Sequence, residues 1–291
     1  MITHLCFSGS HIWGICYVGI IRYIYTYPDK FKIRDVGGTS FGAVIAVSFA
    51  LNLDMKTIEK MFYELANSDE LKNTAFENIL NIPDEMGMES TYKYTLLIRK
   101  HIKQFYGADD LTFLELSKKT GINLHVNALC VNTSEEILFN VDNTPDVFIL
   151  DAVQASIAIP FISIPMKINK QLFCDPGFIH NTIVDYFDDI PQEQILSVIN
   201  KPIDIKTNYT EEEMNSSIYL STVFGILCRK IKYGASLQYI NDNTLILNNH
   251  HNIVGISLTE NSILFNIDDK SIDNAIMHGF KLTQEWMNKR K

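Results

Sequence analysis

The pentapeptide Gly38-Thr39-Ser40-Phe41-Gly42 constrains this chain more than any other feature. Residues 33–36 before it read as a short strand, and the nearly unbroken apolar run at 43–53 predicts a buried helix. A serine on so sharp a strand-to-helix turn is held away from the fold, so we expect an exposed hydroxyl, with Gly38 and Gly42 permitting the bend. The start of the following helix would favour a developing oxyanion. The motif predicts a nucleophilic serine, and the alternative is a plain glycine-rich turn.

Composition bounds the size of the core and the class of partner. The chain has 291 residues, 46% of them hydrophobic, and shows no repeat or linker, so we expect one domain over residues 1–291. The polar stretch that begins at residue 66 suggests a lid or insert over residues 66–110. The formal charge of -9 argues against a nucleic-acid partner and provides no broad attraction to anionic lipid. The oligomeric state is left open.

The cysteines and the hydropathy point to an intracellular protein. Five cysteines lie in apolar settings without C-x-x-C spacing, which indicates reduced core residues. We see no signal peptide at the N-terminus and no apolar stretch of the ~18–20 residues that span a bilayer. We therefore expect a cytoplasmic protein whose contact with membranes is at most peripheral.

Periodicity along the chain predicts alternating strands and helices. Two strand-turn-helix units at 5–26 and 33–53 suggest parallel strands joined by a crossover helix. Thr112 to Glu115 has the composition of a capping box that opens a short helix, which Gly121 closes. Residues 188–215 look polar and irregular. Further helices are expected at 55–65 after an Asp54 cap, 91–106, 216–239 and 271–287, and further strands at 124–128, 137–139, 166–168, 172–174, 245–247 and 253–256.

A nucleophilic serine needs a base, because its free pKa leaves almost no alkoxide at neutral pH. The candidate is Asp175, which lies in Phe173-Cys174-Asp175-Pro176-Gly177 at the end of an apolar strand. A turn there would present the carboxylate at the rim of the sheet. The alternative is an ordinary turn, since Asp, Pro and Gly each favour turns for local backbone reasons.

Four stretches of the chain form a pattern that is more specific than any one motif. The stretches are Leu5 to Gly19, the turn Gly38 to Gly42, Ala155 to Pro160 with Pro165 and Asp175-Pro176-Gly177, and Asp273 to Phe280. Together they resemble the patatin-like phospholipase family. They span nearly the whole chain in the family's order, and the third is specific because it runs into the candidate base. The resemblance implies an α/β fold of three layers, α/β/α, around a mostly parallel sheet with a nucleophile elbow.

The resemblance also implies the chemistry, which is hydrolysis of acyl esters of lipids without a cofactor or metal. Ser40 would attack the ester carbonyl and Asp175 would take the hydroxyl proton. Carried over by position, the backbone N–H groups of Gly9, Ser10 and His11 would bind the oxyanion, with Gly14 completing this loop. A carboxylate in direct contact with a serine can act as a base when a partly apolar site raises its pKa.

The chain departs from the family pattern at three places. Ser10 and His11 stand where the family has glycine, and a non-glycine residue forced to positive φ costs on the order of 1–3 kcal/mol. Trp13 stands where the family has a basic residue and cannot pair with a phosphate, which suggests a less anionic head group or weak activity. Pro176 replaces a glycine and removes one backbone donor beside the base.

Other site chemistries have less support. A Ser-Asp-His order is available because four histidines follow Asp175, but none of them stands at a recognisable strand end, and the elbow comes early for an α/β-hydrolase. The segment Gly9 to Gly14 lacks the middle glycine of a dinucleotide loop, and no metal-ligand motif occurs. The histidines in question are His180, His250, His251 and His278.

Two classes of function follow from these observations. The first is an intracellular lipid acyl hydrolase with a Ser40–Asp175 dyad, of phospholipase A or lysophospholipase type. The second is a catalytically weakened relative that binds lipid or a partner protein, which the residues Ser10, His11 and Trp13 suggest. Labelling of Ser40 by an organophosphonate would distinguish the two.

Overall fold

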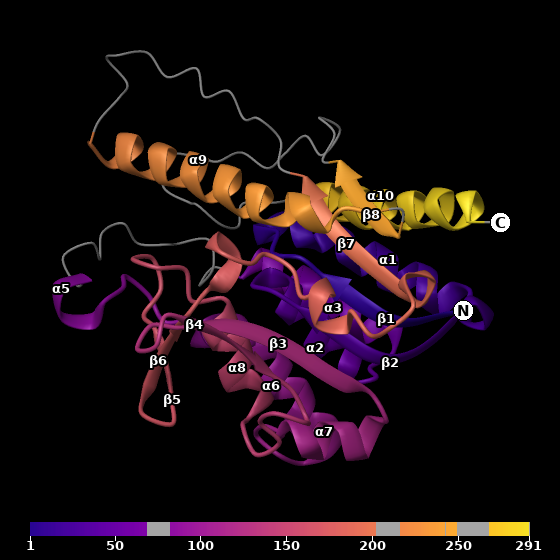
Figure 1. Ribbon diagram of the computed structural model, residues 1–291, viewed down its shortest axis with the longest axis horizontal. Helices are drawn as coiled ribbons and strands as arrows, with labels where there is room; N and C mark the ends of the chain where they lie inside the picture. The colour runs from indigo at the N-terminus through magenta and orange to yellow at the C-terminus, as the bar shows by residue number, and fades with distance from the viewer. Residues whose placement is uncertain (69–81, 202–215, 242, 249–267, 291) are drawn as a thin grey trace.

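A mixed sheet of eight strands forms the framework of the protein, in the order β5-β6-β3-β2-β1-β7-β8 with β4 paired to β3 (Figure 1). The computed structural model describes residues 1–68, 82–201, 216–241, 243–248 and 268–290. Strands β3, β2, β1, β7 and β8 are parallel, while β4 and β6 run antiparallel to β3, and β5 antiparallel to β6. The strands are β1 Ile2–Phe7, β2 Phe31–Gly38, β3 Asn123–Cys130, β4 Glu135–Phe139, β5 Met166–Ile168, β6 Gln171–Cys174, β7 Ile195–Lys201 and β8 Thr244–Asn248.

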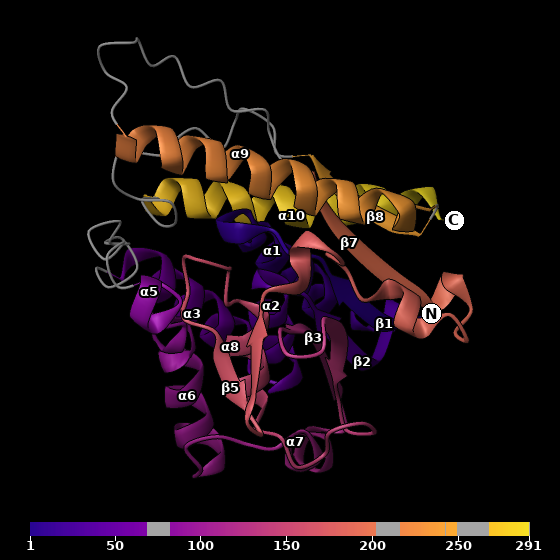
Figure 2. The ribbon, with the colours of Figure 1, turned by 60° about the vertical axis from the view of Figure 1, so that its left-hand side comes forward.

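Helical segments lie on both sides of this sheet, as the two views of the ribbon show (Figures 1 and 2). One face carries α1, α2, α3, α6, α7, α8 and α10 over the large core, and the opposite face carries short 3-10 turns and the end of α9. The α-helices are α1 Ile15–Thr26, α2 Phe41–Ala50, α3 Met55–Asn67, α5 Ile82–Glu85, α6 Tyr92–Tyr106, α7 Phe113–Thr120, α8 Ile149–Ser156, α9 Ser216–Ser236 and α10 Asp269–Lys289. The 3-10 helices are η1 His11–Gly14, η2 Pro28–Lys30, η4 Pro176–Phe178, η5 Val184–Phe187, η6 Gln192–Gln194 and η7 Leu237–Tyr239. This is the expected α/β fold of three layers.

Strand β1 shows how alternation divides the core between the two faces. Leu5 and Phe7 point into the large core under α1 and α2, while Cys6 packs on the other face with Ile183 and Phe187. Successive side chains of a strand point to opposite faces, so a central strand covered on both sides must be apolar on both. Strand β1 ends at Phe7, and residues 8–10 connect it to the 3-10 helix η1, which begins at His11.

The helix termini that the sequence predicted are confirmed in detail. The Asp54 carboxylate accepts from the Thr57 N–H at 3.0 Å and opens α3. The Thr112 hydroxyl accepts from the Glu115 N–H at 3.2 Å and the Glu115 side chain accepts from the Thr112 N–H at 2.9 Å, which is a capping box. Gly121 ends α7 with a φ of 72°, in the left-handed region that favours glycine.

The interpretation of residues 188–215 as irregular is wrong over 195–201. These residues form β7, which pairs in parallel with β1 on one side and with β8 on the other, and six of its seven residues are buried. The expected strand at 253–256 lies outside the described residues, as do residues 69–81 of the expected lid or insert. Within the rest of that segment, α6 packs Tyr94, Ile98 and Ile102 onto the large core. The assignment of 66–110 as a lid remains a prediction.

Helices α1 and α10 approach closely because each contributes a glycine at the crossing. A Cβ built on Gly19 would lie 1.9 Å from the Ile276 carbonyl oxygen, and one built on Gly279 would lie 1.9 Å from the Cys16 carbonyl oxygen. Real Cβ atoms do not approach backbone this closely, so only glycine allows the contact. Across the described ranges, no helix has both the length and the apolar character that crossing a bilayer requires.

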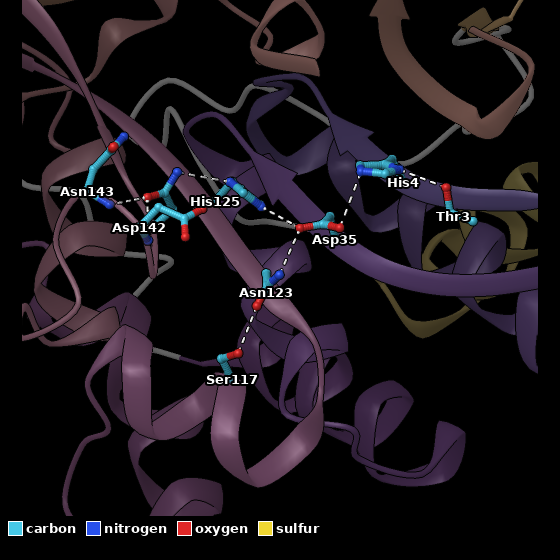
Figure 3. Close-up of polar contacts among 9 residues, drawn as sticks. Thr3, His4, Asp35, Ser117, Asn123, His125, Asp142 and Asn143 are labelled. Carbon is cyan, nitrogen blue, oxygen red and sulfur yellow. Dashed lines mark hydrogen bonds and ion pairs between the residues drawn. The ribbon is translucent and has the colours of Figure 1, made fainter. Parts of the chain in front are cut away.

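A row of polar side chains ties β1, β2 and β3 together (Figure 3). Asp35 lies between His4 and His125, whose Nε2 atoms are 3.2 and 3.0 Å from its two carboxylate oxygens, and it also accepts from Asn123 at 3.1 Å. Burial raises the pKa of the Asp35 carboxyl, but the hydrogen bonds and the histidines outweigh it, so the pKa is lowered overall. The row therefore favours a charged Asp35 in the folded protein.

Candidate active site

The turn that carries Ser40 is a sharp elbow between β2 and α2. Ser40 has φ 54° and ψ -127°, which is unusual for a residue with a side chain. A Cβ on Gly38 would lie 2.2 Å from the Gly42 carbonyl, and one on Gly42 would lie 2.2 Å from the Phe7 carbonyl oxygen. The elbow therefore requires both glycines, because backbone fills the space where their side chains would be.

The structure brings Ser40 and Asp175 together across 135 positions of sequence. The Ser40 hydroxyl donates to Asp175 Oδ2 at 2.7 Å, within the range expected for a nucleophile and its base. Asp175 comes from the end of β6, which adjoins β3, which in turn adjoins β2. Two strand ends at the same rim of the sheet thus present the two side chains to each other.

The expectation of an exposed serine hydroxyl is wrong. Ser40 is 3% exposed and Asp175 is 1% exposed. The loop at Gly9 lies directly against Ser40, since a Cβ on Gly9 would be 3.2 Å from the Ser40 Cβ. The segment after Asp175 is itself contacted by α9. These covering segments are far from Ser40 in sequence, so the elbow motif alone does not encode them.

Backbone contacts fix the direction of the Asp175 carboxylate. Its Oδ1 accepts from the Gly177 N–H at 2.8 Å, and its own N–H donates to the Ala158 carbonyl at 2.8 Å. Pro176 begins the 3-10 helix η4, a position at which proline fits because no N–H is needed there. Although Pro176 has no N–H to donate, Asp175 Oδ1 still has a partner, because the Gly177 N–H donates to it.

The loop expected to hold the oxyanion lies beside the dyad, but the role expected for Gly9 is wrong. The Gly9 N–H donates to the Asn181 carbonyl at 3.2 Å, so Gly9 contributes space and not an oxyanion donor. Ser10 and His11 are not among the described residues with positive φ, so the expected strain at these two positions is absent. A Cβ on Gly14 would lie 2.3 Å from the Phe41 ring, so this glycine lets η1 pack onto the residue after the nucleophile.

Asn181 and Ser156 hold the site in ways that the sequence did not reveal. The Asn181 side-chain amide donates to the Gly9 carbonyl at 3.1 Å and to the Ser236 hydroxyl at 3.0 Å. The Ser156 hydroxyl, at the end of α8, accepts from the Ser40 N–H at 2.8 Å. Both are short polar side chains in otherwise ordinary turn or helix sequence, so only the stretch 155–160 carried a signal.

Another chain of polar contacts runs from the elbow to a partly buried charge cluster of His180, Glu136 and Asp185. The Thr39 hydroxyl donates to Asn127 Oδ1 at 2.8 Å, and Asn127 Nδ2 donates to Glu136 at 2.6 Å and to the His180 carbonyl at 3.4 Å. The His180 ring lies between Glu136 at 2.6 Å and Asp185 at 2.9 Å. Burial lowers the pKa of His180, but hydrogen bonds and charges from both carboxylates outweigh it and raise the pKa to about 9.

This charge cluster bears on the alternative triad. A protonated His180 at neutral pH has no lone pair with which to take a proton from a serine. His278 lies on α10, and His250 and His251 lie outside the described residues. Within the described residues, no group of three or more histidine, cysteine or acidic side chains is placed to hold a metal ion. Asp175 is therefore the group that meets Ser40.

Comparison with known families places the chain in one of them. The sequence model of the family described as patatin-like phospholipase matches residues 5–188, which is more than half of the chain. The chain belongs to the patatin-like phospholipase family, and this membership suggests a lipid ester hydrolase. The match includes the elbow, the Gly9 loop and Asp175, whereas β7, α9, β8 and α10 lie beyond it.

Two viral proteins are similar in sequence over part of their length. An uncharacterised protein of Acanthamoeba polyphaga mimivirus is 28% identical over 189 residues, covering 65% of this chain and 62% of that protein. A protein of Invertebrate iridescent virus 6 named "Probable lipid hydrolase" is 28% identical over 189 residues, covering 62% of this chain and 61% of that protein. The matched region thus spans less than two thirds of each relative.

Two bacterial structures share the fold over 99% of this chain. VipD from Legionella pneumophila superposes with a TM-score of 0.60 at 16% identity, and the match covers 67% of that chain. ExoU from Pseudomonas aeruginosa, solved in complex with SpcU, superposes with a TM-score of 0.51 at 14% identity, and the match covers 52% of that chain. At such identities the likeness concerns the fold.

Proposed function

We propose that this protein is a lipid acyl hydrolase in which Asp175 activates Ser40 directly. The observation that carries the proposal is the 2.7 Å hydrogen bond from the Ser40 hydroxyl to Asp175 Oδ2, made on a strained elbow. The substrate class is a carboxylic ester of a lipid, as for a phospholipase A or a lysophospholipase. Family membership and the relative named as a lipid hydrolase support this class.

The reaction would proceed through an acyl-enzyme. Ser40 Oγ attacks the ester carbonyl carbon while its proton passes to Asp175 Oδ2, and the carbonyl oxygen becomes an oxyanion. The N–H groups of Ser10 and His11 are the proposed oxyanion donors. When the tetrahedral intermediate collapses, the bond to the leaving oxygen breaks and Asp175 returns its proton to that oxygen. Water then attacks the acyl group in the same manner and releases the fatty acid and Ser40.

Burial of the dyad adds a requirement to this mechanism. Because Ser40 and Asp175 are shielded from solvent, a neighbouring segment has to move aside before an ester can reach Ser40. Among the described residues, η4 and the part of α9 that contacts it are the segments that follow the base. In return, a site without bulk water strengthens the electrostatic interactions on which the Ser40–Asp175 pair depends.

The test compares variants of the two reacting side chains with a matched control. Ser40→Ala and Asp175→Asn should each lower kcat on a soluble short-chain acyl ester and on micellar phospholipid by about 10³-fold or more. Ser48→Ala is the control, because Ser48 is also buried on α2 but its hydroxyl donates only locally, to the Val44 carbonyl at 2.7 Å. Turnover near that of the wild type in either dyad variant would refute the mechanism.

A second candidate function is that of a catalytically weakened protein that binds lipid. The burial of the dyad and the engagement of the Gly9 N–H by the Asn181 carbonyl favour it. An organophosphonate probe separates the two functions, because only an activated serine forms the covalent phosphonate. Folded protein that leaves Ser40 unlabelled, while the same probe labels a known serine hydrolase, would favour the binding role.

A further inference from the structure

Two large apolar side chains next to the site are both exposed and both held in strained backbone. Met86 has φ 63° and is 48% exposed, and Phe161 has φ 68° and is 64% exposed. The other non-glycine residues with positive φ among the described residues are Ser40, two asparagines, a serine and a lysine. Positive φ is a marked outlier for a bulky residue, and such strain persists only where the surrounding structure holds the backbone in place.

Met86 and Phe161 belong to neighbouring segments. The Met88 and Glu89 N–H groups both donate to the Ile162 carbonyl, at 2.9 and 3.1 Å, and the Ile164 N–H donates to the Glu89 carbonyl at 2.8 Å. Beneath them, Met88, Ile159 and Ile162 form a small core of their own, separate from the main one. The two exposed side chains therefore project from one small, independently packed unit.

The same unit adjoins the base. Phe178, from η4 just after Asp175, packs against this small core, and the Asp175 N–H donates to the Ala158 carbonyl at its edge. The next residue, Ile179, is 62% exposed. We call Met86, Phe161 and Ile179 the apolar rim. All three are carried by segments bonded to or continuous with the segment that positions Asp175.

We propose that the apolar rim docks the protein onto a lipid surface, in the orientation that brings the dyad to its substrate. Exposed apolar side chains gain free energy when an acyl-chain layer replaces water around them, and their backbone strain keeps them projecting. Among the described residues, the hydrophobic core clusters do not include Phe161. This inference rests on the proposed function, since it assumes that the site takes a lipid ester.

The charges select the kind of lipid surface. Asp84 and Glu85, both exposed, immediately precede Met86, and the chain as a whole carries a formal charge of -9. Anionic head groups would be repelled by such a surface, whereas neutral or zwitterionic head groups would not. The occupant is therefore a bilayer or micelle without strong negative charge, such as phosphatidylcholine.

The decisive variant is Phe161→Gly, made in the full chain. Glycine accepts positive φ, so the substitution relieves strain and Tm should stay unchanged or rise. Loss of one buried aromatic from the lipid layer should weaken partition onto phosphatidylcholine vesicles by about tenfold or more. Phe105→Ala is the matched control, because Phe105 is 49% exposed on α6 and lies outside the rim, and it should partition like the wild type.

Two measurements keep this proposal separate from the proposed function. Vesicle partition is measured by co-sedimentation with Ser40→Ala as the parent, so it does not depend on turnover. Hydrolysis of a soluble short-chain ester is measured with Phe161→Gly in the otherwise native chain, where kcat should be retained. If the wild type does not hydrolyse the soluble ester, the proposed function fails. The partition measurement still decides whether the apolar rim binds a lipid surface.

Several outcomes would refute the proposal that the apolar rim docks on a lipid surface. Partition unchanged by Phe161→Gly, or reduced equally by Phe105→Ala, would mean that Phe161 does not enter the lipid. A large fall in Tm for Phe161→Gly would mean that this side chain serves the fold. Stronger binding when phosphatidylglycerol is added to the vesicles would contradict the charge argument. Self-association through Phe161 in place of vesicle binding would identify a second copy of the chain as the occupant.

Discussion

Asn181→Ala tests whether the loop at Gly9 is held in place from outside. The Asn181 amide donates to the Gly9 carbonyl at 3.1 Å and to the Ser236 hydroxyl at 3.0 Å, in a site closed to water. Loss of the Asn181 donor leaves the buried Gly9 carbonyl with only a long contact from the Ser8 hydroxyl at 3.5 Å, at a cost of about 1–3 kcal/mol, and removes a second hydrogen bond of about 1 kcal/mol. We therefore expect the free energy of unfolding to fall by about 2–4 kcal/mol.

The effect on turnover follows from the same contact. The main-chain bond from the Gly9 N–H to the Asn181 carbonyl survives the substitution, so the loop is loosened and not released. Losing one oxyanion donor outright lowers kcat by a factor of roughly 100 to 1000, and a loosened loop should lower it by about 10 to 100. The KM for a soluble ester should change little, because this loop is proposed to act on the developing oxyanion.

The assay pairs steady-state hydrolysis of a soluble acyl ester with urea denaturation of the same samples. Asn140→Ala is the control, because Asn140 is also buried and its side chain also forms several hydrogen bonds. Its Oδ1 accepts from the Asp142 and Asn143 N–H groups at 3.0 and 2.7 Å, and its Nδ2 lies 3.4 Å from His125 Nδ1. It should lose comparable stability and keep its kcat. If Asn181→Ala keeps wild-type kcat, or loses no more than Asn140→Ala does, the positioning argument is refuted.

Two further predictions concern stability. Gly279→Ala should lower the free energy of unfolding by about 1–3 kcal/mol or more, because the new Cβ would lie 1.9 Å from the Cys16 carbonyl oxygen. Gly234→Ala is the control, because a Cβ there would have nothing within 4 Å, and it should be neutral or stabilising by up to about 1 kcal/mol. Equal melting temperatures for the two variants would disprove the close crossing of α1 and α10. The pKa of His180 is raised from 6.5 to about 9, so its contribution is complete below pH 6.5 and is lost as the pH rises toward 9. Urea titrations should show a loss of about 1–3 kcal/mol over this range, allowing for solvent screening, and His180→Gln should abolish it.

Local sequence predicted those parts of the fold whose cause is local. The capping box at Thr112, the cap at Asp54 and the left-handed Gly121 each depend on three or four consecutive residues. The elbow is similar, because glycines at 38 and 42 are required wherever a strand turns so sharply into a helix. The pairing of Ser40 with Asp175 has no local cause. It was predicted from the resemblance of ordered motifs, and the geometry of the two turns is compatible with it.

The remaining features depend on contacts between distant segments. Strand β7 carries the apolar run Ile195–Ile199, broken only by Ser197, as is typical of a strand that is covered on both faces. The residues before and after this run are mostly polar, so the average over a longer stretch of sequence hides it. Burial of Ser40 arises from the Gly9 loop and from the chain after Asp175. The role of Asn181 follows from its approach to Gly9, 172 positions away, and no spacing rule indicates such a pair.

Strand β3 carries neither reacting residue, yet it sets the spacing between them. It lies between β2, which leads to Ser40, and β6, which leads to Asp175, and its Asn127 contacts both Thr39 and the His180 carbonyl. A slip of β3 by one residue would bring Val126 or Ala128 to that point, and neither side chain can form those bonds. During refolding, we therefore expect esterase activity to return only after both long-range pairings of β3 have closed. The rate at which hydrolysis recovers would then report the last step of sheet assembly, which comes well after the chain has collapsed.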